Sequence, residues 1–405
     1  MSVNLTEPKS LLPVKGVRLS SITAGIKKNQ TDDLVLIELA KNSQCAAVFT
    51  QNKFCAAPVT LAKKHLQAKV PRFLLINSGN ANAGTGKKGM LDALESCELV
   101  AKQTNCAADE VLPFSTGVIG ENLPVSKIAA ALPELYCQLA EENWINAGRG
   151  IMTTDTKLKG ISRQVELQGK IVTVTGLSKG AGMIQPNMAT MLSYVATDAM
   201  IDKELLQQCL NSAVQLSFNS ITVDSDTSTN DACVLIATGQ ANNEVITHKS
   251  SDEYQTLLDV ITEVCLYLAQ AIIRDAEGAT KFVSLQVNTA GSINDARQVA
   301  YTVAHSPLVK TALFASDPNW GRILAAVGRA GVDFDIDKIQ IYLDDVCIVS
   351  AGGRDAAYTE EQGQKVMNQQ EIAIRIELNT GTHSACIWTS DLSYDYVKIN
   401  SEYRS

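Results

Sequence analysis

The stretch at residues 177–194, LSKGAGMIQPNMATMLSY, constrains this chain more than any other segment. The glycines Gly176, Gly180 and Gly182 allow backbone conformations that a Cβ atom would forbid. Pro186 then fixes its own φ and pushes the residue before it towards an extended conformation. The apolar run that starts after position 190 is typical of a buried strand. We therefore expect a sharp turn that leads directly into the protein core.

Ala189 and Thr190 stand where this turn meets the expected strand. The hydroxyl of a threonine held against the preceding carbonyl can attack it, and hydrolysis of the resulting ester breaks the chain. Thr190 would then be a new N-terminus whose α-amine titrates near pH ~7.7–8.0, so that a base and a nucleophile share one residue. On spacing alone, a glycine-rich loop before an ordinary strand threonine is the favoured interpretation, because such loops are common.

The run from Lys179 to Leu192, followed by Thr197-Asp198-Ala199, resembles the self-cleavage signature of the ornithine acetyltransferase (glutamate N-acetyltransferase) family of arginine biosynthesis. Ala181 stands where relatives usually carry serine, which exchanges one small residue for another. The resemblance continues along nearly the whole chain. It implies that the precursor cleaves itself between Ala189 and Thr190.

Cleavage at that bond would divide the chain into an α chain, residues 1–189, and a β chain, residues 190–405. Strand-like and helix-like segments occur in both halves, which indicates a layered α/β or α+β fold. The resemblance implies the αββα sandwich of self-processing N-terminal-nucleophile enzymes, assembled as two α and two β chains. Periodicity predicts helices near 59–68, 90–104, 125–139, 203–218 and 253–274, and strands at 339–349 and 372–378.

Composition narrows the possible partners. The 43 acidic residues outnumber the 35 basic ones and give a net charge of −8, so no nucleic-acid partner is expected. We find neither a signal-like N-terminus nor an apolar run long enough to span a membrane, which favours a cytoplasmic protein without membrane association. The ten cysteines are scattered singly and the four histidines lack ligand spacing, so no metal and no cofactor are expected.

Thr116 and Gly117, within the segment 111–120, form the second chemical candidate. Acyl transfer develops a negative charge on an oxygen atom, and preset hydrogen-bond donors around that oxygen supply a large part of the catalysis. A threonine hydroxyl beside an unobstructed glycine N–H suits this role, although a strand end with a turn would look the same. The resemblance implies that Thr116 and Gly117 are the oxyanion hole.

Three residues are candidates for binding an amino-acid substrate. Thr153 belongs to a cluster of hydroxyls with one carboxylate that is also typical of helix capping, and the adjacent Thr154 could take its place. Lys179 would meet a substrate carboxylate, and Glu277 a substrate amine. A solvated lysine and a solvated helix-end carboxylate are the ordinary alternatives. The assignments of Thr153, Lys179 and Glu277 are implied by the resemblance.

Further segments carry weaker signals. Chain termini are usually frayed, but the resemblance implies that the tail enters the substrate site through Asn400 and Ser405. The asparagine-rich run at 77–89 departs from a P-loop, because Thr85 stands where the lysine should be. The run at 224–231 departs from a calcium loop and is expected to frame the site by hydrogen bonding.

The resemblance implies that Thr190 carries an acetyl group from N2-acetyl-L-ornithine to L-glutamate in a ping-pong reaction, with acetyl-CoA as a possible second donor. Two alternatives belong to other classes. One is a self-processing amidohydrolase or aminopeptidase, in which water replaces glutamate. The other is a non-catalytic binding protein that retains the loop without cleaving.

Overall fold

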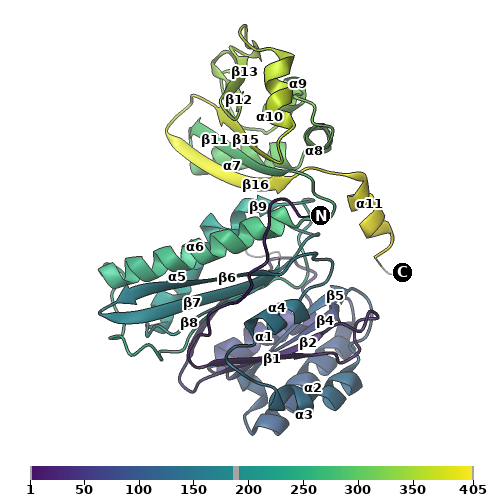
Figure 1. Ribbon diagram of the computed structural model, residues 1–405, viewed down its shortest axis with the longest axis vertical. Helices are drawn as coiled ribbons and strands as arrows, with labels where there is room; N and C mark the ends of the chain where they lie inside the picture. Colours follow the sequence, from purple (N-terminus) through teal and green to yellow (C-terminus); the bar gives the residue numbers. More distant parts are fainter. Residues whose placement is uncertain (1, 186–190, 404–405) are drawn as a thin grey trace.

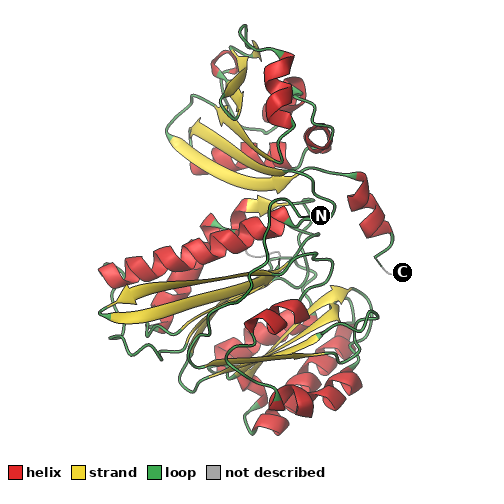
Figure 2. Cartoon of the chain, in the orientation of Figure 1, coloured by secondary structure: helices red, strands yellow, loops and turns green. Residues whose placement is uncertain are grey.

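The computed structural model describes residues 2–185 and 191–403. Over these residues the strands form three β-sheets, two of which stack face to face while the third forms a separate C-terminal lobe (Figure 1). Helices cover the outer faces of the stacked pair (Figure 2). The layers run helix, sheet, sheet, helix, so the expected αββα sandwich is confirmed.

The first sheet comes entirely from the N-terminal part of the chain. Its strands, in spatial order, are β1 (Val17–Ile22), β2 (Leu34–Leu39), β4 (Phe73–Asn80) and β5 (Val111–Val118). All pairs are antiparallel except β4 with β5. Its outer face packs against α1 (Ala57–Ala68), α2 (Gly86–Thr104) and α3 (Val125–Cys137).

The second sheet takes strands from both sides of the predicted cleavage point. Its spatial order is β3 (Gln44–Phe49), β10 (Ala232–Ala237), β8 (Leu192–Thr197), β7 (Lys170–Lys179) and β6 (Lys159–Leu167). The strands β8 and β10 are buried at every position because both faces of the sheet are covered. β7 and β8 flank the glycine-rich stretch and pair antiparallel, with Lys179 opposite Leu192.

Alternate residues of β8 serve two different cores. Tyr194 points towards the first sheet, where its ring meets Phe114 edge to face at 5.4 Å between centroids. Val195 points the other way, towards α5 (Lys203–Leu216) and α6 (Asp252–Arg274). β8 therefore contributes side chains both to the layer between the two sheets and to the layer between the second sheet and its helices.

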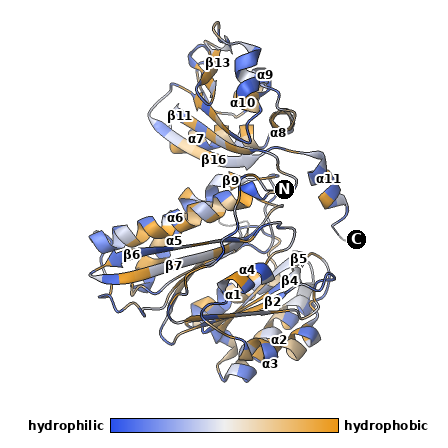
Figure 3. Ribbon diagram, in the orientation of Figure 1, coloured by the Kyte–Doolittle hydropathy of each residue, from blue (hydrophilic) through white to orange (hydrophobic). Residues whose placement is uncertain are grey.

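Helix α6 is the one helix in the described part of the chain that is long and apolar enough, by composition, to cross a membrane. Its apolar residues nevertheless form the core between the second sheet and α5. Orange and blue residues are mixed along it in Figure 3, as in an amphipathic helix. Packing against the sheet therefore accounts for its hydrophobicity.

The third sheet has the order β14-β13-β12-β15-β11-β16-β9. Its strands are β9 (Ile221–Thr222), β11 (Phe282–Ala290), β12 (Gln340–Leu343), β13 (Val346–Ser350), β14 (Gly353–Arg354), β15 (Glu371–Glu377) and β16 (His383–Ser390). The helices of this lobe are α7 (Ile293–Ala304), α8 (Pro307–Phe314), α9 (Trp320–Gly328) and α10 (Glu360–Met367).

One strand expectation in this lobe is wrong. The segment 339–349 is a hairpin of β12 and β13 rather than a single strand, because the chain reverses at Asp344, which has a φ of 48°. Asp and Asn tolerate the left-handed region better than most residues, and an Asp-Asp pair is turn chemistry. The period of two does not persist through the turn: buried residues alternate in β12, whereas Ile348 and Val349 are both buried in β13 and the pairing of the two strands is irregular.

Two short helices bring residues to the site. α4 (Trp144–Gly150) packs beside β1 and leads into the threonine cluster that starts at Thr153. α11 (Tyr394–Ser401) leaves the third lobe and extends along the side of the molecule (Figure 1). Its Tyr396 hydroxyl donates to Asp224 at 3.1 Å.

Candidate active site

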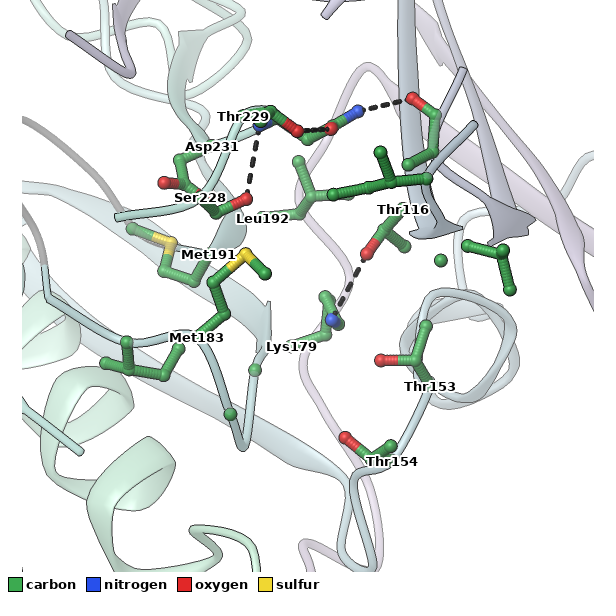
Figure 4. Close-up of a pocket in the computed structure, with 18 of the residues that line it drawn as sticks. Thr116, Thr153, Thr154, Lys179, Met183, Met191, Leu192, Ser228, Thr229 and Asp231 are labelled. Carbon is green, nitrogen blue, oxygen red and sulfur yellow. Dashed lines mark hydrogen bonds between the residues drawn. The ribbon is translucent and has the colours of Figure 1, made fainter. Parts of the chain in front are cut away.

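A cavity of about 260 Å³ lies where β5 and β7 end and β8 begins. Six of the residues selected from the sequence line it: Thr116, Gly117, Thr153, Lys179, Glu277 and Asn400. They come from three segments of the first 180 residues and from two segments beyond position 270. Figure 4 shows Lys179 pointing at Thr116, with the hydrogen bond between them drawn as a dashed line, and Thr153 and Thr154 beside them.

Ala189, Thr190 and Ser405 lie outside the described residues. The residues on both sides of the 186–190 segment, Ile184 and Met191, do line the cavity. The carbonyl of Met191 accepts the N–H of Ala232 at 2.9 Å, which fixes the start of β8 against β10.

The end of β5 requires glycine at position 117. The pairing between β4 and β5 is irregular at Gly79 and Asn80, and there Gly117 has a φ of 134°. A Cβ built on Gly117 would lie 2.3 Å from the carbonyl carbon of Gly79. Both the positive φ and the closeness of the Gly79 backbone therefore exclude a side chain at position 117, so no side chain stands there next to Thr116.

Lys179, at the end of β7, reaches across to the first sheet. Its Nζ donates to Thr116 Oγ1 at 3.2 Å. Burial lowers the pKa of the Lys179 ammonium, and the nearby Asp155 carboxylate opposes this effect. The residue selected as a carboxylate binder therefore sits in direct contact with the candidate oxyanion hole.

Glu277 closes the cavity from the other side. It is only 8% exposed, and its Oε2 accepts a hydrogen bond from Asn400 Nδ2 at 2.7 Å. Its N–H donates to the carbonyl of Ala181 at 2.9 Å. A Cβ at Gly182 would lie 2.4 Å from Glu277 Oε2, so the glycine-rich loop is shaped to admit this carboxylate. The tail meets the site through Asn400.

The threonine cluster contributes both of its candidates, since Thr153 and Thr154 each line the cavity. Its carboxylate, Asp155, is engaged by the protein. Asp155 accepts hydrogen bonds from the N–H groups of Thr153 at 3.0 Å and Gly180 at 2.7 Å. Asp155 therefore holds the loops of the site through their backbone N–H groups.

The two loop segments frame the site in different ways. In the 77–89 run, Asn80 and Asn82 hold the loop through backbone carbonyls of residues 121, 122 and 89, while Ala81 lines the cavity. In the 224–231 run, Asp224 accepts the N–H groups of Met183 and Ile184 at 2.7 and 2.9 Å. The expectation that this second run frames the site by hydrogen bonding is confirmed.

Sequence reasoning missed further residues at the site. Tyr403 lines the cavity beside Asn400. Asp231 is 3% exposed, and its Oδ2 has no hydrogen-bond partner in the described structure. Burial raises the pKa of Asp231 well above its usual range, which favours a neutral carboxylic acid. Asp231 belongs to the 224–231 run, but its burial and its unpartnered oxygen are seen only in the structure.

The arrangement suits acyl transfer to or from an amino acid. A hydroxyl and a glycine N–H stand ready at one end of the cavity, and an ammonium and a carboxylate flank it. Within residues 2–185 and 191–403, no group of three or more His, Cys, Asp or Glu side chains has the arrangement of a metal site.

Comparisons with known proteins place this chain among its relatives. The model of the ArgJ family matches residues 18–405. The arginine biosynthesis bifunctional protein ArgJ of Pseudomonas fluorescens is 55% identical over the whole of both chains. That of Methylococcus capsulatus is 56% identical over 98% of this chain and 97% of its own.

Among solved structures, the crystal structure of the arginine biosynthesis bifunctional protein ArgJ from Bacillus halodurans is similar, with a TM-score of 0.50 and 37% identity. The match covers 53% of this chain and all of that one. The chain belongs to the ArgJ family, and the family resemblance read from the glycine-rich stretch is confirmed.

Proposed function

We propose that this protein is an acetyltransferase of arginine biosynthesis that transfers the acetyl group of N2-acetyl-L-ornithine to L-glutamate. The observation that carries the proposal is that one cavity is lined by all four of Thr116, Gly117, Lys179 and Glu277. It combines oxyanion donors with one positive and one negative side chain. Membership of the ArgJ family supports the same activity.

The first step is self-cleavage between Ala189 and Thr190. The Thr190 hydroxyl attacks the carbonyl carbon of Ala189, and hydrolysis of the ester leaves the α-amine and the hydroxyl of Thr190 free. The resulting chains, 1–189 and 190–405, share the second sheet, because β7 precedes the cut and β8 follows it. They remain one folded unit, which we propose assembles as two α and two β chains.

The acetyl group then moves in two halves. The Thr190 oxygen attacks the acetyl carbonyl carbon of N-acetylornithine while its α-amine takes the hydroxyl proton. The Thr116 hydroxyl and the Gly117 N–H donate hydrogen bonds to the oxyanion. Ornithine leaves with the proton, an acetyl ester remains on Thr190, and the amine of glutamate attacks that ester to give N-acetylglutamate.

Both substrates are amino acids, so the same side chains serve in both halves. The Lys179 ammonium pairs with a substrate carboxylate and Glu277 with a substrate amine, while Thr153, Asn400 and Ser405 complete the binding site. We propose acetyl-CoA as a second acetyl donor, in keeping with the word bifunctional in the names of the relatives. We place the enzyme in the cytoplasm.

Initial-rate kinetics test the reaction. With N-acetylornithine and glutamate varied together, double-reciprocal plots should give parallel lines, as a covalent intermediate requires. Acetate released in place of N-acetylglutamate would instead identify an amidohydrolase. An intact chain with neither reaction would identify a binding protein.

Replacing Lys179 by methionine should raise the KM for both substrates by about 10- to 100-fold, because a hydrogen-bonded charge pair contributes roughly 1.5–3 kcal/mol. The effect on kcat should be smaller, since the lost contact binds ground state and transition state alike. Steady-state kinetics on the cleaved variant measure the two constants separately. Lys170→Met, at the exposed start of the same strand, is the matched control and should behave as wild type.

A further inference from the structure

Three buried charged side chains lie directly behind the cavity. Lys159 Nζ stands 2.6 Å from Asp155 Oδ1 and 2.6 Å from Asp275 Oδ2. The side chains of Asp155 and Lys159 are fully shielded from solvent and that of Asp275 is 1% exposed. Two carboxylates therefore share one ammonium, and this buried triad carries one excess negative charge. Burying ions is costly unless each of them is hydrogen-bonded.

Both carboxylates of the triad are hydrogen-bonded, because they accept backbone N–H groups of the loops near the site. Asp155 binds the N–H of Thr153 and that of Gly180, the residue that follows Lys179. Asp275 accepts the N–H groups of Thr156 and Lys157 at 2.9 and 3.1 Å. Two residues beyond Asp275 stands Glu277. The triad thus links the three segments that supply the proposed substrate-binding side chains.

The triad also lies within the electrostatic reach of Lys179. In the described structure Lys179 has no carboxylate within 4.0 Å, and its ammonium donates to Thr116. Burial lowers the pKa of Lys179, and the largest opposing influence is the Asp155 carboxylate. The other titratable groups that face Lys179 are Glu277 and, when ionised, Asp231, which raise its pKa, and Lys159 and Lys27, which lower it.

We propose that Asp155, anchored by Lys159 and Asp275, is a positioning residue that fixes the loops of Thr153 and Lys179 and sustains the positive charge of Lys179. This inference rests on the proposed function, in which Lys179 binds a substrate carboxylate. Asp155 is itself an ionised partner, because despite its burial the ammonium of Lys159 and then that of Lys179 hold its pKa below the usual range.

The anchor also joins the two proposed chains. Asp155 and Lys159 precede the cut at 189/190, whereas Asp275 follows it. The ion pair between Lys159 and Asp275 therefore crosses from one proposed chain to the other. After cleavage it keeps Thr153 and Lys179, on the α chain, in register with Glu277, on the β chain.

The test is the pH profile of kcat/KM for N-acetylornithine, measured on cleaved Asp155→Asn enzyme. Lysine is charged below its pKa, so binding through Lys179 is lost as pH rises through that pKa and produces a high-pH limb. Removing a nearby carboxylate lowers the pKa of Lys179 further. The limb should therefore move down by about one pH unit, the lower end of what a close charge produces.

Asp391→Asn is the matched control. Asp391 is likewise buried, and it accepts the N–H groups of Thr280 and Lys281 at 2.8 and 3.0 Å. It is not among the charges that act on Lys179. The control should lose stability without moving the limb, which separates a structural effect from an electrostatic one.

A second variant covers the case in which Asp155→Asn does not fold. Replacing the whole triad with neutral side chains, Asp155→Asn, Lys159→Met and Asp275→Asn together, leaves no charge of the triad unpaired and is tolerated far better than removing one partner. It removes one net negative charge and should shift the limb in the same direction by a smaller amount.

The outcomes separate the two proposals. A wild-type enzyme without acetyl transfer at any pH refutes the proposed function. If the wild-type enzyme transfers acetyl and its high-pH limb superimposes on that of the folded triple variant, the role of Asp155 is refuted, while the proposed function stands.

Discussion

Thr190→Ala protein should purify as one uncut chain and transfer acetyl groups at least about 10⁴-fold more slowly than the wild type. Removing a covalent nucleophile leaves only the contributions of binding and of the oxyanion hole. This variant also lacks the hydroxyl that breaks the preceding bond, so it never gains the α-amine that serves as base. Intact mass spectrometry detects the uncut chain, and N-acetylglutamate formation measures the rate.

Thr190→Ser is the matched control for this result. Serine keeps the hydroxyl and, after cleavage, the α-amine, so this variant should yield two chains and measurable transfer. If Thr190→Ala protein appeared as two chains meeting at 189/190, the assignment of the cleaving hydroxyl would be wrong. Wild-type protein that stays whole and still transfers acetyl would remove the need for the free amine.

Gly117→Ala should lower kcat by at least about 10²–10³-fold, the usual cost of losing one oxyanion donor. The added methyl group would meet the carbonyl carbon of Gly79 at 2.3 Å and the nitrogen of Asn80 at 2.5 Å. Both are backbone atoms, so β4 and β5 must separate and the N–H of Gly117 must turn away. Burst kinetics of acetyl-enzyme formation would show that the chemical step is slowed.

Gly120→Ala makes a matched control, because Gly120 also has a positive φ, 88°, while nothing lies within 4 Å of a Cβ built there. Alanine at position 120 has the unfavourable positive φ, but its methyl group clashes with no neighbouring atom. We expect a modest loss of stability and kcat close to wild type. Equal losses of kcat in both variants would contradict the oxyanion role of Gly117.

Much of the sandwich could be predicted from local patterns. The helix expected at 125–139 is α3, and that at 253–274 is α6, within two residues at each end. These helices have clear apolar stripes because each covers one face of a sheet. The hairpin of β12 and β13 was missed because both arms have strand-like residues and the two-residue turn between them, Asp344-Asp345, was not recognised as a turn.

Of the candidate site, the sequence predicted the residues that lie in local motifs. Thr116, Gly117 and Lys179 stand in recognisable motifs, and the structure brings them together. Asp155, Lys159 and Asp275 could not be assembled in the same way, because Lys159 and Asp275 are 116 positions apart. Neither residue lies in a motif that predicts an ion-pair partner, so their pairing is a property of the tertiary fold alone.

The pairing of β7 with β8 has a consequence for how the mature enzyme can be made. A cut at 189/190 falls in the connection between these neighbouring strands, so the finished sheet persists while the covalent link is gone. The precursor folds as a single molecule, at a rate independent of its concentration. The cut enzyme, once denatured, would have to find its other half by diffusion, so its recovery would depend on dilution. If the chain is cut as proposed, efficient folding must therefore precede the cut.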